Sequence, residues 1–172
     1  MASPSARVHR AEGPDDWADA RRLIAAYLDS LGFDIGFQGV DDELADPRAC
    51  YGPPTGVGLL ACTPADGAVG FTGVRAFGAD GDAELKRMYV DPAGRGLGLG
   101  RALGAAAVAE SRRLGYRRLL LDTRASLVAA CALYRSLGFV EVAPYRYNPY
   151  DDVLFLAHDL GHDAPAGEPT AP

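Results

Sequence analysis

The sequence has few residues that could form disulfides or bind metal. Its three cysteines, Cys50, Cys62 and Cys131, are widely spaced, odd in number and form no C-x-x-C pair. That pattern argues against both a disulfide framework and a zinc site, and it predicts a reducing compartment. The three histidines have no metal-ligand spacing either, so we predict no metal.

The chain also lacks long apolar runs and an excess of positive charge. No run of about 18 apolar residues occurs, and residues 1–13 contain no apolar core of a signal peptide. The net charge of −6 argues against a protein that mainly binds nucleic acid or an anionic membrane surface. We therefore predict a cytoplasmic protein with no nucleic-acid or membrane partner. Lys86 is the single lysine, so most positive charge is arginine, which suits phosphate and carboxylate recognition.

A length of 172 residues with 48% hydrophobic and 23% charged residues is typical of one globular domain. The segment 33–54 mixes Gly, Pro and acidic residues and is predicted to be irregular, with a short helical stretch at 40–45. Short, turn-rich connections predict an antiparallel meander over 57–90, and strand, helix and strand over 84–121 predict a βαβ unit. Apolar periodicity predicts helices over 17–31, 99–114 and 126–137, and strands over 6–12, 57–62, 68–76, 83–90, 119–121, 140–145 and 153–160.

A glycine-rich turn lies between a predicted strand and helix, in the residues VDPAGRGLGLGR at 90–101. Glycines let the backbone approach a ligand, and the free N–H groups of a helix N-terminus bind phosphate. A Walker loop is excluded because no lysine follows these glycines. The dinucleotide fingerprint lacks its third glycine, but Asp122 lies about where a ribose-binding carboxylate would, so a dinucleotide-binding oxidoreductase remains a rival.

Two motifs resemble those of the GCN5-related N-acetyltransferases (GNAT family). Arg95-Gly96-Leu97-Gly98-Leu99-Gly100 resembles motif A, whose signature is Arg or Gln, two residues, Gly, one residue, then Gly or Ala. ALYRSLGF at 132–139 resembles motif B, a helix with a tyrosine four residues before Gly-Phe. The resemblance implies the GNAT fold, an α/β fold of the α+β type with a central mixed, mostly antiparallel sheet flanked by helices on both faces. The domain would span 1–160, and 161–172 is predicted to be a disordered tail.

The resemblance implies acetyl-CoA as the cofactor, with its pyrophosphate on backbone N–H groups and its pantetheine arm beside the preceding strand. A main-chain N–H near Met88 or Val90 would polarise the thioester carbonyl. Leu127 departs from the family, because many members carry asparagine at that position. The cofactor-binding residues implied are Met88, Tyr89, Val90, Arg95, Gly96, Leu97, Gly98, Leu99, Gly100 and Arg101.

Two residues are candidates for catalysis. Glu84 lies 11 residues before Arg95, the spacing at which histone-modifying members of the family place a general-base glutamate. The resemblance gives Tyr134 the role of acid toward the CoA sulfur. Each has an ordinary alternative: Glu84 as an ion-paired carboxylate at a strand edge, and Tyr134 as a core residue.

The function expected from this resemblance is N-acetyltransfer from acetyl-CoA to a small amine or amino-acid-like acceptor by direct attack. A protein N-terminal or lysine acetyltransferase remains an alternative, as does a non-enzymatic acyl-CoA-binding module. The acidic residues of 34–46 either attract a cationic amine or form a solvated loop. A homodimer is suggested by analogy with the family alone.

Overall fold

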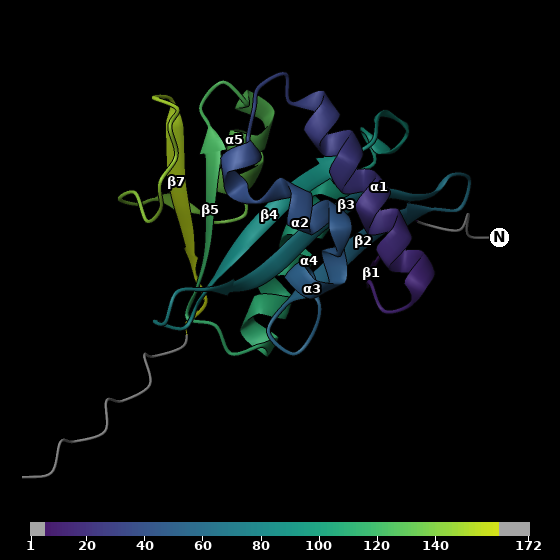
Figure 1. The fold of residues 1–172 in the computed structure, drawn as a ribbon, viewed down its shortest axis with the longest axis horizontal. Helices are drawn as coiled ribbons and strands as arrows, with labels where there is room; N and C mark the ends of the chain where they lie inside the picture. Colours follow the sequence, from purple (N-terminus) through teal and green to yellow (C-terminus); the bar gives the residue numbers. More distant parts are fainter. Residues whose placement is uncertain (1–5, 162–172) are drawn as a thin grey trace, which may run out of the picture.

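A mixed seven-stranded sheet with the order β1-β2-β3-β4-β5-β7-β6 organises residues 6–161, the part of the chain that the computed structural model describes (Figure 1). The strands are β1 (Arg7–Arg10), β2 (Val57–Thr63), β3 (Gly67–Phe77), β4 (Asp82–Val90), β5 (Arg118–Arg124), β6 (Val140–Glu141) and β7 (Val153–Asp159). The helices are α1 (Pro14–Ser30), α2 (Val40–Ala45), α3 (Pro47–Tyr51), α4 (Leu99–Arg113) and α5 (Val128–Ser136), with 3-10 turns at Gly36–Gln38 and Pro92–Gly94.

The sheet confirms the predicted fold class. Every neighbouring pair of strands is antiparallel except β4 and β5, which are parallel and joined through α4. This is the predicted βαβ unit, since a parallel pair needs a crossover whereas the meander β2-β3-β4 needs only turns.

Helices cover both faces of the sheet, with α1, α2 and α3 on one face and α4 and α5 on the other (Figure 1). Because successive strand residues point to opposite faces, β2 sends Leu59 toward α4 and Leu60 toward α1. The α1 face contributes Trp17 and Leu23 to one core cluster, and α4 contributes Leu103 to the other. The two cores hold the sheet between helical layers and fix the strands that carry the site.

Strands β4 and β5 pair over only three residues before they separate. Asp82, Ala83 and Glu84 lie opposite Arg118, Leu119 and Leu120, and no further pair forms between the two strands within residues 6–161. Asp82 accepts hydrogen bonds from Arg118 at this closed end, at 2.6 and 3.1 Å. In the described part of the chain, the edge of β4 that faces β5 is therefore left without a strand partner beyond Glu84.

A bulge interrupts β4 where the strands separate. Opposite β3, the register shifts between Phe71 and Gly73, so β4 holds an extra residue there. Arg87 in this bulge has φ of +58°, the left-handed region that non-glycine residues seldom occupy.

Several predicted boundaries are wrong in detail. The strand predicted over 140–145 is reduced to β6, because Pro144 cannot donate to a ladder. Helix α5 begins at Val128 instead of at the predicted residue 126, because the Leu127 N–H is bonded to the Arg124 carbonyl in a preceding turn. Helix α3 lies in the segment predicted to be irregular.

The predicted tail, 161–172, lies outside the described residues except for Gly161. All three cysteines are free thiols. Within residues 6–161, no helix is both long and apolar enough to span a bilayer, and no cluster of His, Cys, Asp or Glu side chains is arranged to hold a metal.

Candidate active site

A pocket lies where β4 and β5 diverge. It is lined by residues 85–88 of β4 and 121–124 of β5, with Tyr134 of α5 on one side of the sheet. Tyr27 of α1, the segment 33–38, and Asn148 and Tyr150 before β7 close the pocket on the other side. The opening thus connects the α4–α5 face with the α1–α2 face.

The glycine-rich loop leads into α4, as predicted. Gly96 and Gly98 have φ of +77° and +73°, values that strain any other residue, and Gly98 is the N-cap of α4. Gly98 has no side chain to cap the helix, so the first-turn N–H groups of Leu99, Gly100 and Arg101 have no capping side chain within residues 6–161. The loop therefore offers uncapped donors at the positive end of the α4 dipole.

The two arginines of the loop differ in their surroundings. Arg95 and Arg101 are both exposed, but Arg101 donates to the Ser136 hydroxyl at 3.0 Å and so links α4 to α5. Leu97, also predicted to bind cofactor, is exposed at 56%, and Leu99 is buried in the core. The loop therefore presents the Arg95 and Leu97 side chains at its surface together with its backbone N–H groups.

The end of β4 offers a free strand edge to a ligand. Tyr89 and Val90 pair with β3 on one side, whereas their edge toward β5 has no partner strand in the described chain. Met88 and Val90 pack toward the α4 core cluster, and Tyr89 packs toward the α1 cluster. An extended chain of amide groups could pair with this edge as an added strand would.

Tyr134 combines burial with contact to the pocket. Its residue is 7% exposed, its ring meets Phe139 edge to face at 5.9 Å, and it lines the opening. Its hydroxyl has no hydrogen-bond partner among residues 6–161. Burial raises the pKa of Tyr134 far above its ordinary value, so the hydroxyl stays protonated and can donate a proton or a hydrogen bond.

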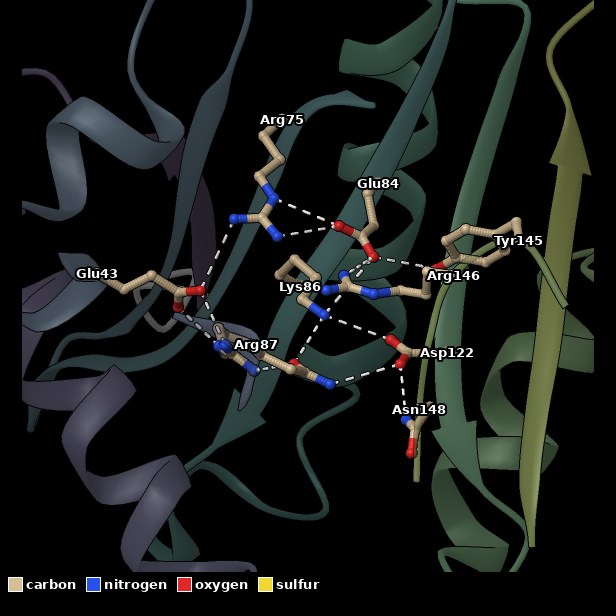
Figure 2. Close-up of polar contacts among 10 residues, drawn as sticks. Glu43, Arg75, Glu84, Lys86, Arg87, Asp122, Tyr145, Arg146 and Asn148 are labelled. Carbon is tan, nitrogen blue, oxygen red and sulfur yellow. Dashed lines mark hydrogen bonds and ion pairs between the residues drawn. The ribbon is translucent and has the colours of Figure 1, made fainter. Parts of the chain in front are cut away.

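Glu84 lies behind the pocket and does not line it. The residue is 0% exposed, and its carboxylate accepts hydrogen bonds from Arg75, Arg146 and Tyr145 (Figure 2). Burial acts to raise the pKa of Glu84, but the charges of Lys86 and Arg146 outweigh it and lower that pKa. Glu84 is thus an ionised carboxylate held by cations.

Lys86 and Asp122 form the polar floor of the pocket. Their charged atoms lie 3.3 Å apart, one strand facing the other across the opening (Figure 2). Gln38 accepts from Lys86 at 2.9 Å, and Asn148 donates to Asp122 at 2.9 Å. Burial alone would raise the pKa of Asp122, but Lys86 and Asn148 lower it, so the carboxylate is ionised. Burial lowers the pKa of Lys86.

Arg87 is held in the bulge by Glu43 of α2. Its Nε and Nη2 donate to the two carboxylate oxygens at 2.7 and 2.8 Å, and both side chains are nearly inaccessible. Burial alone would lower the pKa of Arg87, but the hydrogen bonds and charge of Glu43 raise it above its ordinary value. The bidentate pair therefore connects α2 to the strained residue of β4.

Met88 and Tyr134, both candidate residues from the sequence, line the pocket. Lys86, Arg87 and Arg124 had no predicted role there, and Asp122 was considered only as a ribose-binding carboxylate of a dinucleotide site. A signal was present, because Glu84 and Lys86 lie two residues apart on β4 with the apolar Leu85 between them, and Asp122 and Arg124 lie two residues apart on β5. Two polar stripes on one face of neighbouring buried strands indicate a polar site between them.

Comparisons with known proteins agree with this geometry. A family model described as the Acetyltransferase (GNAT) family matches residues 20–139. The chain is 43% identical over 147 residues to an uncharacterised N-acetyltransferase of Schizosaccharomyces pombe, covering 86% of this chain and 90% of that protein. It is 32% identical over 123 residues to N-acetylaspartate synthetase of Danio rerio, covering 72% of this chain but 41% of that protein. A Salmonella typhimurium structure with its cofactor acetyl-CoA has a TM-score of 0.69 at 22% identity, covers 95% of this chain and 99% of its own, and shows the same fold.

Proposed function

The chain belongs to the GNAT family of acetyltransferases, and we propose that it transfers the acetyl group of acetyl-CoA to the amine of a small, amino-acid-like acceptor. The observation that carries this proposal is the opening between β4 and β5. On the α4–α5 face, it lies on the side of the sheet that carries the uncapped α4 N-terminus and the protonated Tyr134. On the α1–α2 face, its floor is formed by the charged pair of Lys86 and Asp122. One face suits an acyl donor and the other a polar acceptor.

The residues of the chain fit acetyl-CoA on the α4–α5 side. The N–H groups of residues 96–101 suit the pyrophosphate, and the free edge of β4 at 88–90 suits the amide groups of the pantetheine arm. When bound, acetyl-CoA supplies an activated thioester as the acetyl source. A backbone N–H on the free edge near Met88 or Val90 would polarise its carbonyl.

Tyr134 is our proposed acid. Tyr134 lines the opening, and burial keeps its hydroxyl protonated, so it can donate a hydrogen bond to a departing thiolate. The Cys131 thiol of the same helix is directed elsewhere, to the Arg124 carbonyl at 3.4 Å.

The acceptor must react as a neutral amine, and the pocket favours that form. Lys86, Arg87 and Arg124 line it beside a single carboxylate, Asp122, and nearby positive charge lowers the pKa of an ammonium group. Asp122 can orient the amine and take its proton. Glu84, predicted as the base, can act only through a relay, because it is fully buried and does not line the pocket.

The small-acceptor part of the proposal has two supports. The pocket is closed by the segment 33–38 and by Tyr150, whose hydroxyl donates to the Asp34 carbonyl at 2.6 Å. The chain is also similar to N-acetylaspartate synthetase, whose name specifies an amino-acid product.

The test is an acceptor screen with purified protein and acetyl-CoA. Amino acids, polyamines and short peptides are offered singly, CoA thiol release is followed, and the acetylated product is identified by mass. We expect one or more free amino acids to be acetylated. Acetylation of peptides alone would contradict the small-acceptor proposal, and acetyl-CoA binding without any product would favour a binding module.

Comparison of Asp122→Asn with Glu84→Gln then separates the two carboxylates. We expect D122N to lower kcat at every pH, because Asp122 lines the pocket. A larger loss in E84Q, with thermal stability unchanged, would instead support the relay through Glu84.

A further inference from the structure

Three cations line the pocket, but their surroundings differ. Lys86 donates to Gln38 and to Asp122 and lies 3.6 Å from Glu84. Arg87 uses Nε and Nη2 on Glu43 and Nη1 on Gln38. Both are therefore engaged by groups of the protein itself, and neither has much capacity left for a ligand.

Arg124 is the exception among the lining cations. Its Nε donates to Asp152 at 2.6 Å, and no residue of 6–161 accepts a hydrogen bond from its two Nη nitrogens. The side chain is 26% exposed, so the guanidinium is within reach of the pocket and of solvent. A guanidinium with two free terminal nitrogens is the group that binds a carboxylate through paired hydrogen bonds.

The guanidinium is also held in place. Its Cζ lies 4.7 Å from the centre of the Phe33 ring and 4.4 Å from that of Tyr150. The two rings contact each other edge to face at 5.5 Å, and the Tyr150 hydroxyl is fixed on the Asp34 carbonyl. Cation–π contact and the Asp152 ion pair therefore orient the Arg124 guanidinium before a ligand binds, which lowers the entropy cost of binding.

Charge in and around the pocket favours an anion. The lining charges and all residues connected to them through successive ion pairs comprise five cations and four carboxylates: Arg75, Lys86, Arg87, Arg124 and Arg146 against Glu43, Glu84, Asp122 and Asp152. An amino acid with a neutral, reactive amine carries one negative charge, which balances this excess.

The spacing along β5 suits a molecule with two polar groups. Arg124 and Asp122 are two residues apart and project from the same face of the strand, roughly 7 Å from each other along it. A small molecule can bridge that span with its amine at Asp122 and its carboxylate at Arg124.

We propose that Arg124 is the specificity-determining residue that binds the carboxylate of the acceptor, so that the enzyme selects amines that carry a free carboxylate close to the amine. This inference rests on the proposed function, because it names the acceptor class of the same site. Arg124 acts here on binding and discrimination, and takes no part in proton transfer.

The test compares L-amino acids with their amides, which keep the amine and the side chain but lose the carboxylate. The probes are acidic, polar, aliphatic and aromatic L-amino acids and the amide of each, assayed by CoA release. We expect kcat/KM of the native enzyme to favour the free acids. Arg124→Gln should lower kcat/KM for the acids about 10- to 100-fold and for the amides far less. Arg124→Lys should recover part of the loss through its single charge.

Arg118→Gln is the matched control. Arg118 is on the same strand and pairs with a carboxylate, Asp82, but lies at the closed end of the sheet away from the pocket. Arg118→Gln should change kcat/KM by the same factor for the amino acids and for their amides. Equal use of acids and amides by the native enzyme would overturn the proposal, as would an equal loss for both series in R124Q.

A binding measurement separates this inference from the proposed function. N-acetyl-amino acids and their amides are titrated in the presence of CoA, and the melting temperature is recorded for native protein and R124Q. Carboxylate-dependent stabilisation that R124Q abolishes supports the carboxylate site even if no acceptor is turned over. Turnover of amines with no preference for acids, and no stabilisation by N-acetyl-amino acids, would leave the transferase intact and refute the site.

Discussion

Replacing Glu43 by Gln should show how much the ion pair between α2 and the bulge of β4 contributes to the free energy of unfolding. The change keeps the shape of the side chain but leaves the Arg87 guanidinium charged and nearly inaccessible, since the two side chains are 1% and 2% exposed. Removing one partner of a buried ion pair typically costs about 3–5 kcal/mol, a large part of the stability of a small domain. Arg75, at 3.9 Å from Glu43, would also lose an opposite charge.

The assay is urea unfolding followed by the fluorescence of Trp17, the single tryptophan, which is 8% exposed in the α1 core. A double variant with Arg87→Met should recover most of the loss, because it removes the unpaired charge and keeps an apolar stem. Asp19→Asn is the surface control: its Arg22 pair is 51% and 41% exposed and should be worth about 0–1 kcal/mol. A loss in E43Q below about 1 kcal/mol would refute the reasoning.

Three further outcomes are expected. Tyr134→Phe should keep the melting temperature within a degree or two, because the hydroxyl has no partner among residues 6–161, but lower kcat about 100-fold or more in the CoA-release assay. Equal kcat in both proteins would remove Tyr134 as the acid. Gly73→Ala should destabilise by about 1–3 kcal/mol in urea, because its Cβ would lie 2.4 Å from the buried Tyr51 ring. Stability should fall with acidification below about pH 4.5, because the folded-state pKa values of Glu84 and Asp122 lie below 4.5 and 3.8, so their stabilisation is present above these values and lost as they protonate. If the stability of E84Q falls with acidification as steeply as that of the native protein, groups other than Glu84 cause the loss.

Local sequence signals predicted the parts of the site that depend on neighbouring residues. The start of α4 requires a left-handed backbone conformation at residue 98, and the glycine at that position predicts it. Tyr134 follows from a motif within one helix. Helix α3 was missed although Asp46-Pro47 is an N-cap signal, with Asp46 accepting from the Ala49 N–H at 3.1 Å.

The polar half of the site could not be predicted because its contacts join distant parts of the chain. Glu43 and Arg87 are 44 positions apart, and neither residue type nor spacing indicates that they meet. Arg146 reaches Glu84 from a segment between β6 and β7 that has no regular structure. Such pairings depend on strand order and register, which long-range packing sets.

The brief pairing of β4 with β5 also has a mechanical consequence. The sheet is in effect two panels, β1–β4 and β5–β7, joined along three residue pairs and fastened at that end by Arg117 and Arg118 on Asp82. A force that pulls β1 away from β6 would act on these three residue pairs and two ion pairs, whereas a full-length strand pairing would distribute the same force over more hydrogen bonds. We therefore expect β4 and β5 to separate first under force. A ligand that contacts both strands should raise the force needed to separate them.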